Sequence, residues 1–209
     1  MAEHEINLPM DEEKTRQLRV RDVVYLSGEA YTIRDAAYER ILSALCSGSS
    51  IPFDLRKRLV WHAGPITQQE GNRWKPVSIG STTSSRFTYP VSQIIEKLGV
   101  RLILGKGRMG KEVSQALAKH GAAYVINTGG AAAYYANQVE EIFEVHWLDL
   151  GMPAAVWGLR VKRLGPLIVA MDSEAGNLFD ERTSQVDASL RRIYSELGID
   201  PDHKYIWWP

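Results

Sequence analysis

Residues 100–127 contain the sequence pattern that most restricts the fold of this chain. The apolar run at 100–104 is followed by glycines at three of the next six positions, then by a helix-forming stretch at 111–121 and a second apolar run at 122–127. Two strands joined through one helix run in the same direction, because the helix returns the chain to the starting edge of the sheet. The pattern therefore predicts a β-α-β unit within an α/β fold that contains neighbouring parallel strands.

The glycine loop, defined as residues 105–110, has the spacing G-x-G-x-x-G of dinucleotide-binding loops. Such a loop requires an acidic residue at the end of the second strand, and Asn127 stands there instead. Lys106 lies between the first two glycines, where its side chain would crowd a pyrophosphate, and no G-K-S/T sequence follows. Two interpretations remain: the turn and the helix N-terminus bind another anion beside Lys106, or the glycines only turn the chain.

The rest of the chain divides into short strand-like and helix-like segments. The expected segments are two strands joined at Ser27-Gly28 within 22–33, a helix at 34–45, a turn at Gly71-Asn72 between two strands, a helix at 90–98, and two more strands within 156–172. No interior linker interrupts this order. Residues 1–209 are therefore expected to form a single domain, with residues 1–20 as an N-terminal extension.

The composition argues against several classes of protein. Basic and acidic residues balance at 25 each, which gives no basic surface to attract nucleic acid. Cys46 is the single cysteine, so this chain alone builds neither a disulfide nor a four-cysteine metal site. No apolar run approaches the roughly 20 residues that cross a bilayer, and the acidic start MAEHEINLPMDEEK differs from a signal peptide. We expect a soluble, cytoplasmic protein with no nucleic-acid or membrane partner.

Three cationic side chains stand at the ends of expected strands, beside glycines or hydroxyl residues. Arg34 follows the stretch 22–33, Arg86 ends the hydroxyl-rich stretch SIGSTTSSR, and Lys106 lies in the glycine loop. Each guanidinium can bind a carboxylate through two hydrogen bonds, and the lysine adds a point charge. The three together favour a small dianionic ligand. Taken alone, the hydroxyl-rich stretch is more simply a Ser/Thr turn with a solvated Arg86.

Several segments, in order along nearly the whole chain, resemble one enzyme family. The segments are YTIRDAAYER, WHAGPI, SIGSTTSSR, LGKGRMG, QVEEIFEVHWLDLGMPAAVW, GPLIVAMDSEAGNLFDE and IYSELGIDPDHKYIWWP. Together they resemble the β subunit of the two-subunit class I fumarases and L-tartrate dehydratases, which is equivalent to the C-terminal domain of single-chain class I fumarases. No single motif is decisive, but the ordered set is highly specific.

The resemblance implies a fold and an activity. The fold is the swivelling β/β/α domain, an α/β arrangement of mixed sheets flanked by helices. The activity is that of a hydro-lyase, the reversible hydration of fumarate to (S)-malate at a [4Fe-4S] cluster. The α subunit holds the cluster, so this chain is expected to bind no metal or cofactor alone and to act only in an αβ hetero-oligomer. The alternatives are the β subunit of an L-tartrate dehydratase or a mesaconate-type hydratase, and a non-catalytic dicarboxylate-binding or assembly subunit.

The resemblance also assigns roles to four residues. It places Arg34, Arg86 and Lys106 on the substrate carboxylates, where fixed cations stabilise the charge that develops when a neighbouring proton is removed. It places Thr82 at the position of the proposed catalytic base. A threonine hydroxyl is a weak base, so that role requires the neighbouring cations to lower its pKa strongly.

Further residues are expected to support the site or to set its specificity: Asp35, Tyr38, His62 and Thr83. Asp35 is expected to orient Arg34 or, more simply, to stabilise the helix N-terminus. A structural role is favoured for His62, because a lone histidine is more often structural. The chain departs from the family motifs at Tyr38, where the family has histidine, and at Ser81, where it has proline. A phenol in contact with substrate would change the chemistry, because its pKa is about 10 and that of imidazole about 6.5.

Overall fold

The structure is a computed structural model that describes residues 1–200. The strands are β1 (Glu3–Asn7), β2 (Val23–Thr32), β3 (Leu59–Trp61), β4 (Ala63–Glu70), β5 (Arg73–Ser81), β6 (Leu102–Gly105), β7 (Ala123–Ile126), β8 (Val139–His146) and β9 (Val156–Met171). The α-helices are α1 (Glu12–Thr15), α2 (Asp35–Ser47), α3 (Thr88–Leu98), α4 (Lys111–His120), α5 (Ala132–Ala136) and α6 (Leu178–Leu197). Two short 3-10 helices are η1 (Ser84–Phe87) and η2 (Leu148–Leu150).

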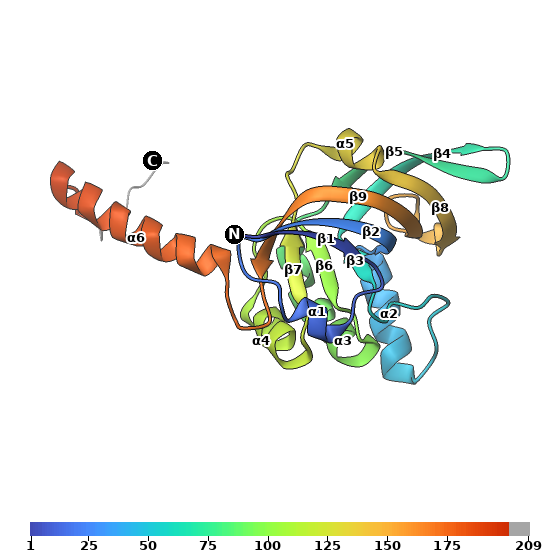
Figure 1. The fold of residues 1–209 in the computed structure, drawn as a ribbon, viewed down its shortest axis with the longest axis horizontal. Helices are drawn as coiled ribbons and strands as arrows, with labels where there is room; N and C mark the ends of the chain where they lie inside the picture. The colour runs from blue at the N-terminus through green and yellow to red at the C-terminus, as the bar shows by residue number, and fades with distance from the viewer. Residues whose placement is uncertain (201–209) are drawn as a thin grey trace, which may run out of the picture.

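Seven strands form one mixed sheet in the order β1-β2-β3-β6-β7-β9-β8, and β4 and β5 form a separate hairpin. β2, β3, β6 and β7 run parallel to one another, whereas β9 runs antiparallel to β7. β9 also pairs antiparallel with β2, so the sheet curls back on itself into a barrel-like arrangement (Figure 1). The predicted α/β fold with mixed sheets and flanking helices is confirmed.

The predicted β-α-β unit is confirmed at β6, α4 and β7. The two strands are parallel, with Leu102 opposite Ala123 and Gly105 opposite Ile126. Gly121 follows α4 with a φ of 62°, the left-handed conformation that glycine adopts without strain. The predicted turn at Gly71-Asn72 is also confirmed, because β4 and β5 pair on either side of it.

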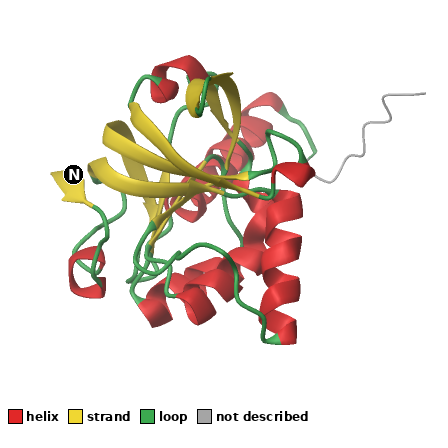
Figure 2. Cartoon of the chain, turned by 90° about the vertical axis from the view of Figure 1, so that its right-hand side faces the viewer, coloured by secondary structure: helices red, strands yellow, loops and turns green. Residues whose placement is uncertain are grey.

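Two hydrophobic cores fix the positions of the strand ends. Helices α2, α3 and α4 pack against one face of the sheet (Figure 2). Successive strand residues point to opposite faces, so Ile103 packs against these helices while Leu102 and Leu104 pack in the second core with Trp61 and Trp157. Full burial of one such aliphatic side chain stabilises the fold by about 1.5–3 kcal/mol. The ends of β3, β6 and β7 are therefore held between two packed layers.

Two of the expected strand pairs are wrong, because each is one long strand. Within the stretch 22–33, residues 23–32 form the single strand β2, whose pairing with β9 shifts register on either side of Leu26, and Gly28 has a φ of 121°. The stretch 156–172 is the single strand β9 as far as Met171. The turn-forming pair Ser27-Gly28 indicated that the chain reverses its direction within the first stretch. In the barrel the same residues bend strands that continue and pair with partners distant in the sequence.

Residues 1–20 are integrated into the sheet and the core. β1 lies parallel to β2 at the edge of the large sheet. Met10 and Leu18 are buried in the second core, together with Trp61 and Trp157. The segment expected as an N-terminal extension thus contributes one edge strand and two core side chains.

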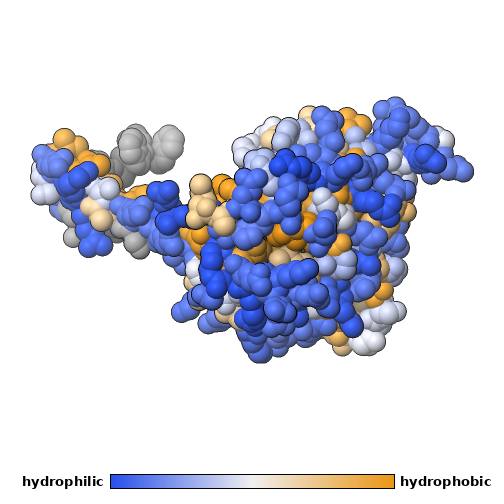
Figure 3. Space-filling model, in the orientation of Figure 1, coloured by the Kyte–Doolittle hydropathy of each residue, from blue (hydrophilic) through white to orange (hydrophobic). Residues whose placement is uncertain are grey.

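α6 extends away from the barrel (Figure 1), and apolar surface lies along it (Figure 3). The exposed apolar side chains on it are Val186, Leu190, Ile193 and Leu197. Within residues 1–200, no helix combines the length and the apolar character needed to cross a membrane. The last motif of the resemblance continues into residues 201–209, and that part of it lies outside the described residues.

Candidate active site

The carboxyl ends of β2, β3, β6 and β7 lie at one edge of the sheet, and predicted site residues follow three of them. Arg34 comes two residues after β2, His62 follows β3, and Lys106 follows β6. Ligands of open parallel sheets bind outside this edge, because the loops of neighbouring strands meet there. The parallel strand order therefore explains how residues from distant parts of the sequence come together.

The hydroxyl-rich loop after β5 is fastened to the same edge by backbone contacts. The Thr82 N–H donates to the His62 carbonyl at 2.7 Å. Thr83 forms a parallel β-bridge with Lys106, and the Ser84 N–H donates to the Lys106 carbonyl at 3.0 Å. Thr82 is half-buried and Thr83 is exposed. These contacts bring the two threonines and the lysine together at the carboxyl edge.

The Arg34 side chain is half-buried against the first residues of β4. Its Nη1 packs so closely on Gly64 that a Cβ at that position would stand 2.5 Å away. In the part of the chain that is described, Arg34 Nε is buried without a hydrogen-bond partner. Leaving a buried donor unsatisfied costs about 1–3 kcal/mol. Arg34 is thus held by packing, with one buried guanidinium donor unsatisfied within the described residues.

Arg86 and Asp35 form an ion pair on the exposed side of the site. Arg86 Nη2 lies 3.3 Å from Asp35 Oδ2, and the two side chains are 50% and 49% exposed. Asp35 lies in the first turn of α2, where the sequence placed it to stabilise the helix N-terminus, but its carboxylate pairs with Arg86 and not with Arg34. Exposed ion pairs contribute about 0–1 kcal/mol, so a ligand carboxylate can compete for Arg86 at little cost.

A buried series of hydrogen bonds lies directly behind these residues. Tyr38 Oη is 2.7 Å from His62 Nε2, and His62 Nδ1 is 2.9 Å from Ser84 Oγ. The Lys106 N–H donates to Ser84 Oγ at 3.3 Å. Tyr38 is 2% exposed, and both His62 and Ser84 are fully buried. Sequence reasoning missed Ser84, because nothing in the run STTSS distinguishes the hydroxyl that turns inward.

Burial keeps the titratable groups of this series neutral. It lowers the pKa of His62 to about 3 and raises the pKa of Tyr38 well above its ordinary value. The Tyr38 hydroxyl contacts His62 in the interior. The departure from the family's histidine at this position therefore lies behind the site and not on its exposed surface.

The glycine loop packs against the segment that begins at Ser84. At Gly105, a Cβ would stand 1.9 Å from Ser84 Oγ and 3.1 Å from His62 Nδ1, so no side chain fits there. The Gly110 N–H donates to Thr88 Oγ1 at 3.1 Å. The glycines therefore do more than turn the chain, because they allow the loop to touch its neighbour.

Lys106 and Asn127 follow the last paired residues of β6 and β7. The Asn127 N–H donates to the Gly105 carbonyl at 3.1 Å, and Gly105 itself pairs with Ile126. Asn127 is 8% exposed, and among the described residues neither side-chain amide atom has a partner. The Lys106 side chain runs along Gly129, where a Cβ would lie 3.7 Å from its Cδ. Asn127 is thus a buried polar residue near the proposed substrate lysine, and sequence reasoning had not included it in the site.

Comparison of the sequence with known proteins assigns this chain to a family. The sequence model described as Fumarase C-terminus matches residues 2–182. The chain belongs to the fumarase C-terminus family. The resemblance to the β subunits of class I fumarases and L-tartrate dehydratases is therefore confirmed.

The relatives described here fall into two groups, those of about the same length as this chain and one that is much longer. The L(+)-tartrate dehydratase subunit beta of Escherichia coli (strain K12) is 42% identical over 176 residues, which cover 84% of this chain and 86% of that protein. A putative L(+)-tartrate dehydratase subunit beta of Methanocaldococcus jannaschii is 41% identical over 179 residues, which cover 85% of this chain and 92% of that protein. A putative fumarate hydratase class I of Geobacillus stearothermophilus is 37% identical over 177 residues, which cover 84% of this chain but 33% of that protein.

The residues of this family member do not fit the ligand set of an iron–sulfur cluster. Within residues 1–200, no group of three or more His, Cys, Asp or Glu side chains is placed to bind a metal ion. Cys46 is free and exposed in the last turn of α2. The cluster that the family resemblance implies therefore has no cysteine ligand set in this chain.

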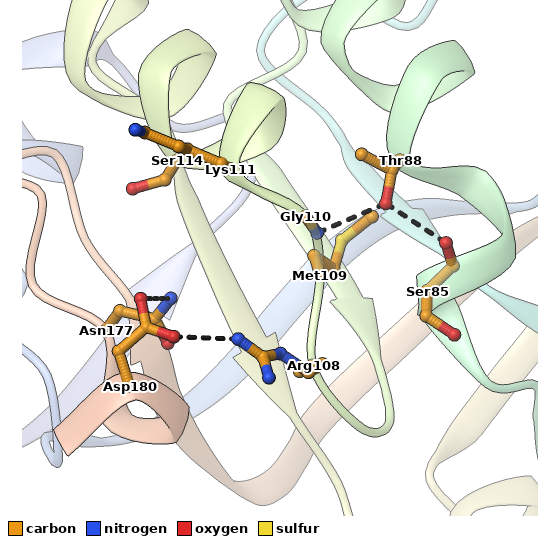
Figure 4. Close-up of a pocket in the computed structure, with 9 residues that line it drawn as sticks. All are labelled: Ser85, Thr88, Arg108, Met109, Gly110, Lys111, Ser114, Asn177 and Asp180. Atoms are coloured by element: carbon orange, nitrogen blue, oxygen red, sulfur yellow. Dashed lines mark hydrogen bonds and ion pairs between the residues drawn. The ribbon is translucent and has the colours of Figure 1, made fainter. Parts of the chain in front are cut away.

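A cavity of about 700 Å³ lies between the glycine loop, α3 and the start of α6 (Figure 4). Its lining residues are Ser85, Thr88, Arg108, Met109, Gly110, Lys111, Ser114, Asn177 and Asp180. The cation Arg108 is already paired within it, at 2.9 Å from Asp180. Arg34, Thr82, Arg86 and Lys106 do not line this cavity. The candidate site of the fumarase C-terminus domain is therefore the carboxyl edge of the sheet and not this cavity.

The burial of His62 predicts a loss of stability in acid. Its pKa is about 3 in the folded chain and 6.5 as the ordinary value, so the unfolded chain binds the proton preferentially between these values. As the pH falls from about 6.5 towards 3, the free energy of unfolding is expected to decrease by a few kcal/mol. Urea unfolding at a series of pH values measures this. The His62→Gln variant lacks the imidazole, so this decrease in its free energy of unfolding should disappear. An unchanged pH dependence in that variant would contradict the prediction.

Proposed function

We propose that this chain is the β subunit of a class I fumarate hydratase, a hydro-lyase that interconverts fumarate and (S)-malate together with an α subunit. The observation that carries the proposal is that Arg34, Thr82, Arg86 and Lys106 belong to segments that meet at the carboxyl edge of the parallel strands of the mixed sheet. Membership of the fumarase C-terminus family and the names of the relatives support the hydro-lyase class.

The proposed chemistry requires fixed positive charge. Removal of the proton next to a carboxylate builds negative charge on the substrate, and preorganised cations stabilise that charge most effectively. We assign this role to Lys106 and the two arginines, which bind the two substrate carboxylates. Thr82 lies beside the Lys106 backbone, because the next residue, Thr83, forms a β-bridge with Lys106. We assign it the proton transfer, which requires these cations to lower the pKa of its hydroxyl.

The proposal places a [4Fe-4S] cluster on the α subunit, because the described residues of this chain do not provide its ligands. When bound, the cluster supplies a Lewis acid for the hydroxyl group that enters or leaves. This chain then holds the carboxylates, and the αβ pair completes the site. The names of the relatives that carry the designation subunit beta support such a partner.

L-tartrate dehydration is the second candidate function, and two observations favour it. The tartrate dehydratase subunits are 41–42% identical to this chain, against 37% for the fumarate hydratase. Tartrate carries one more hydroxyl group than malate, and the buried side-chain amide of Asn127, whose backbone N–H donates to the Gly105 carbonyl, has unmet hydrogen-bonding capacity among the described residues. A buried amide of this kind discriminates between substrates that do and do not satisfy it.

Anaerobic reconstitution with the α subunit tests the proposed function. We expect no hydratase activity from this chain alone or from the α subunit alone, and turnover from the pair. A panel of fumarate, malate, L-tartrate and mesaconate then identifies the substrate. Turnover by this chain without iron would contradict the half-site arrangement. Failure of a cluster-loaded pair on all four compounds would contradict the hydro-lyase assignment and favour a non-catalytic binding or assembly subunit.

A further inference from the structure

We propose that Tyr38, His62 and Ser84 form a positioning unit that sets the geometry of the substrate-binding residues from behind. The inference rests on the proposed function and adds to it. None of the three residues contacts the open edge of the site, since each is at most 2% exposed. Each is instead linked to a residue that we place on the substrate or in the proton transfer.

The unit is connected to three site residues through the backbone. The Tyr38 N–H donates to the Arg34 carbonyl at 2.8 Å, across the first turn of α2. The His62 carbonyl accepts the Thr82 N–H at 2.7 Å. Ser84 makes two hydrogen bonds to Lys106: its N–H donates to the lysine carbonyl at 3.0 Å, and its Oγ accepts the lysine N–H at 3.3 Å.

The side chains of the unit bind one another in series. The imidazole of His62 lies between the Tyr38 hydroxyl, 2.7 Å from Nε2, and the Ser84 hydroxyl, 2.9 Å from Nδ1. The ring also packs at an angle against Tyr38 and against Phe87, with centroid separations of 5.7 and 4.8 Å. These contacts fix the ring from both nitrogens and from its faces, so the backbone of residue 62 has little freedom to move.

The chemistry of the unit argues for positioning over simple core filling. Three fully satisfied polar side chains in a core are not stabilising relative to apolar side chains of the same shape. Their benefit is geometric, since a network in which every member has a partner admits one arrangement. A displacement of about 1 Å in a binding group can cost about 100-fold in rate. The unit holds the strand ends that carry Thr82 and Lys106 against such displacement.

Variants of the reconstituted αβ enzyme test the inference, with kcat and KM measured separately on the substrate that the panel identifies. Tyr38→Phe removes one oxygen, and Ser84→Ala removes the hydroxyl that reaches both His62 and Lys106. We expect Tyr38→Phe to lower kcat about 10-fold and Ser84→Ala about 100-fold, with KM changed less than about threefold. Ser84→Ala should have the larger effect, because Ser84 contacts Lys106 directly.

Two substitutions of the histidine separate its two hydrogen bonds. His62→Asn places an amide where Nδ1 lies and keeps the contact with Ser84, whereas His62→Gln places one where Nε2 lies and keeps the contact with Tyr38. Because Ser84 is the link to Lys106, His62→Asn is expected to retain at least fivefold more kcat than His62→Gln. Equal kcat values for the two variants would contradict the proposal that the unit acts on Lys106 through Ser84.

Tyr31→Phe is the matched control. Tyr31 is also 2% exposed in the same core, but its hydroxyl donates to Glu144 at 2.6 Å and accepts from Arg58 at 3.0 Å, and neither partner is assigned to the site. It should lower the thermal midpoint about as much as Tyr38→Phe while leaving kcat unchanged. If Tyr38→Phe and Ser84→Ala also leave kcat and KM within twofold of wild type, the unit is only structural and the inference fails. The proposed function would survive that result, since it depends on turnover by the wild-type pair. If Ser84→Ala does not fold, Tyr38→Phe with this control decides the question.

Discussion

Replacement of Lys106 by alanine is expected to lower kcat/KM of the reconstituted αβ enzyme by about 100- to 1,000-fold. The lysine is positioned by the Thr83 bridge and by two hydrogen bonds to Ser84, and its side chain lies along Gly129. Its charge is therefore fixed in place before substrate arrives, and water that fills the vacated space must reorganise when the substrate charge develops. Steady-state kinetics of the purified variant measures the effect.

Arg108→Ala is the control for the lysine prediction. Arg108 is a cation of the same glycine loop, but it is exposed and paired with Asp180 at 2.9 Å. Its removal changes the net charge by the same amount and is expected to alter kcat/KM less than about threefold. Equal losses in the two variants would show that the loop acts through its overall charge. A Lys106→Ala enzyme with nearly normal kinetics would show that the substrate binds elsewhere.

Gly105→Ala is expected to destabilise the chain by about 1–3 kcal/mol or more, although alanine is a small residue. The backbone at this position is not left-handed, so the reason is space and not conformation. A Cβ would stand 1.9 Å from Ser84 Oγ and 3.1 Å from His62 Nδ1, and both atoms belong to fully buried residues that cannot move into solvent. Urea unfolding of the purified chain measures the change as a lower midpoint.

Gly80→Ala is the matched control for the glycine prediction. Its nearest neighbour would be the Ala132 Cβ at 3.7 Å, an ordinary contact distance. The free energy of unfolding should change by less than about 0.5 kcal/mol or increase slightly, because alanine restricts the unfolded chain. In the double variant Gly105→Ala/Ser84→Ala the shortest contact is removed, so part of the lost stability should return. If the stability losses of the two single variants simply add in the double variant, the collision is not the cause of the destabilisation.

Much of the fold was predictable because it depends on local patterns. The apolar runs, the helix between them and the glycine at its end specify the β-α-β unit, whose periodicity needs no information from elsewhere in the chain. The same holds for the hairpin turn at Gly71-Asn72. The prediction was wrong at 22–33 and 156–172, where glycines that ordinarily indicate a turn lie in strands that bend around a barrel. Whether such a glycine reverses or bends a strand depends on which strands are available as partners.

The types of residue that we propose to face a dianion could be named from the sequence. Arg34, Arg86, Lys106 and Thr82 were recognised from motifs, and charge and hydroxyl chemistry belong to the residues themselves. The ion pair of Asp35 with Arg86 was not predicted, because the two residues are far apart in the sequence and meet only when α2 and η1 come together. Ser84 and Asn127 were missed for the same reason: burial and hydrogen-bond partners are properties of neighbouring segments, not of the residue.

The tertiary structure alone decided how the chemical groups are arranged. Local sequence determines the conformation of a strand or a helix, since the interactions involved lie within a few residues. The distances between Tyr38, His62, Ser84 and Lys106 depend on the packing of α2, β3, η1 and β6, which are separated along the chain and joined by the order of the sheet. The sequence therefore identified the groups that we propose to bind a dicarboxylate. The closure of the barrel decided which of them stand at the edge and which support them from the core.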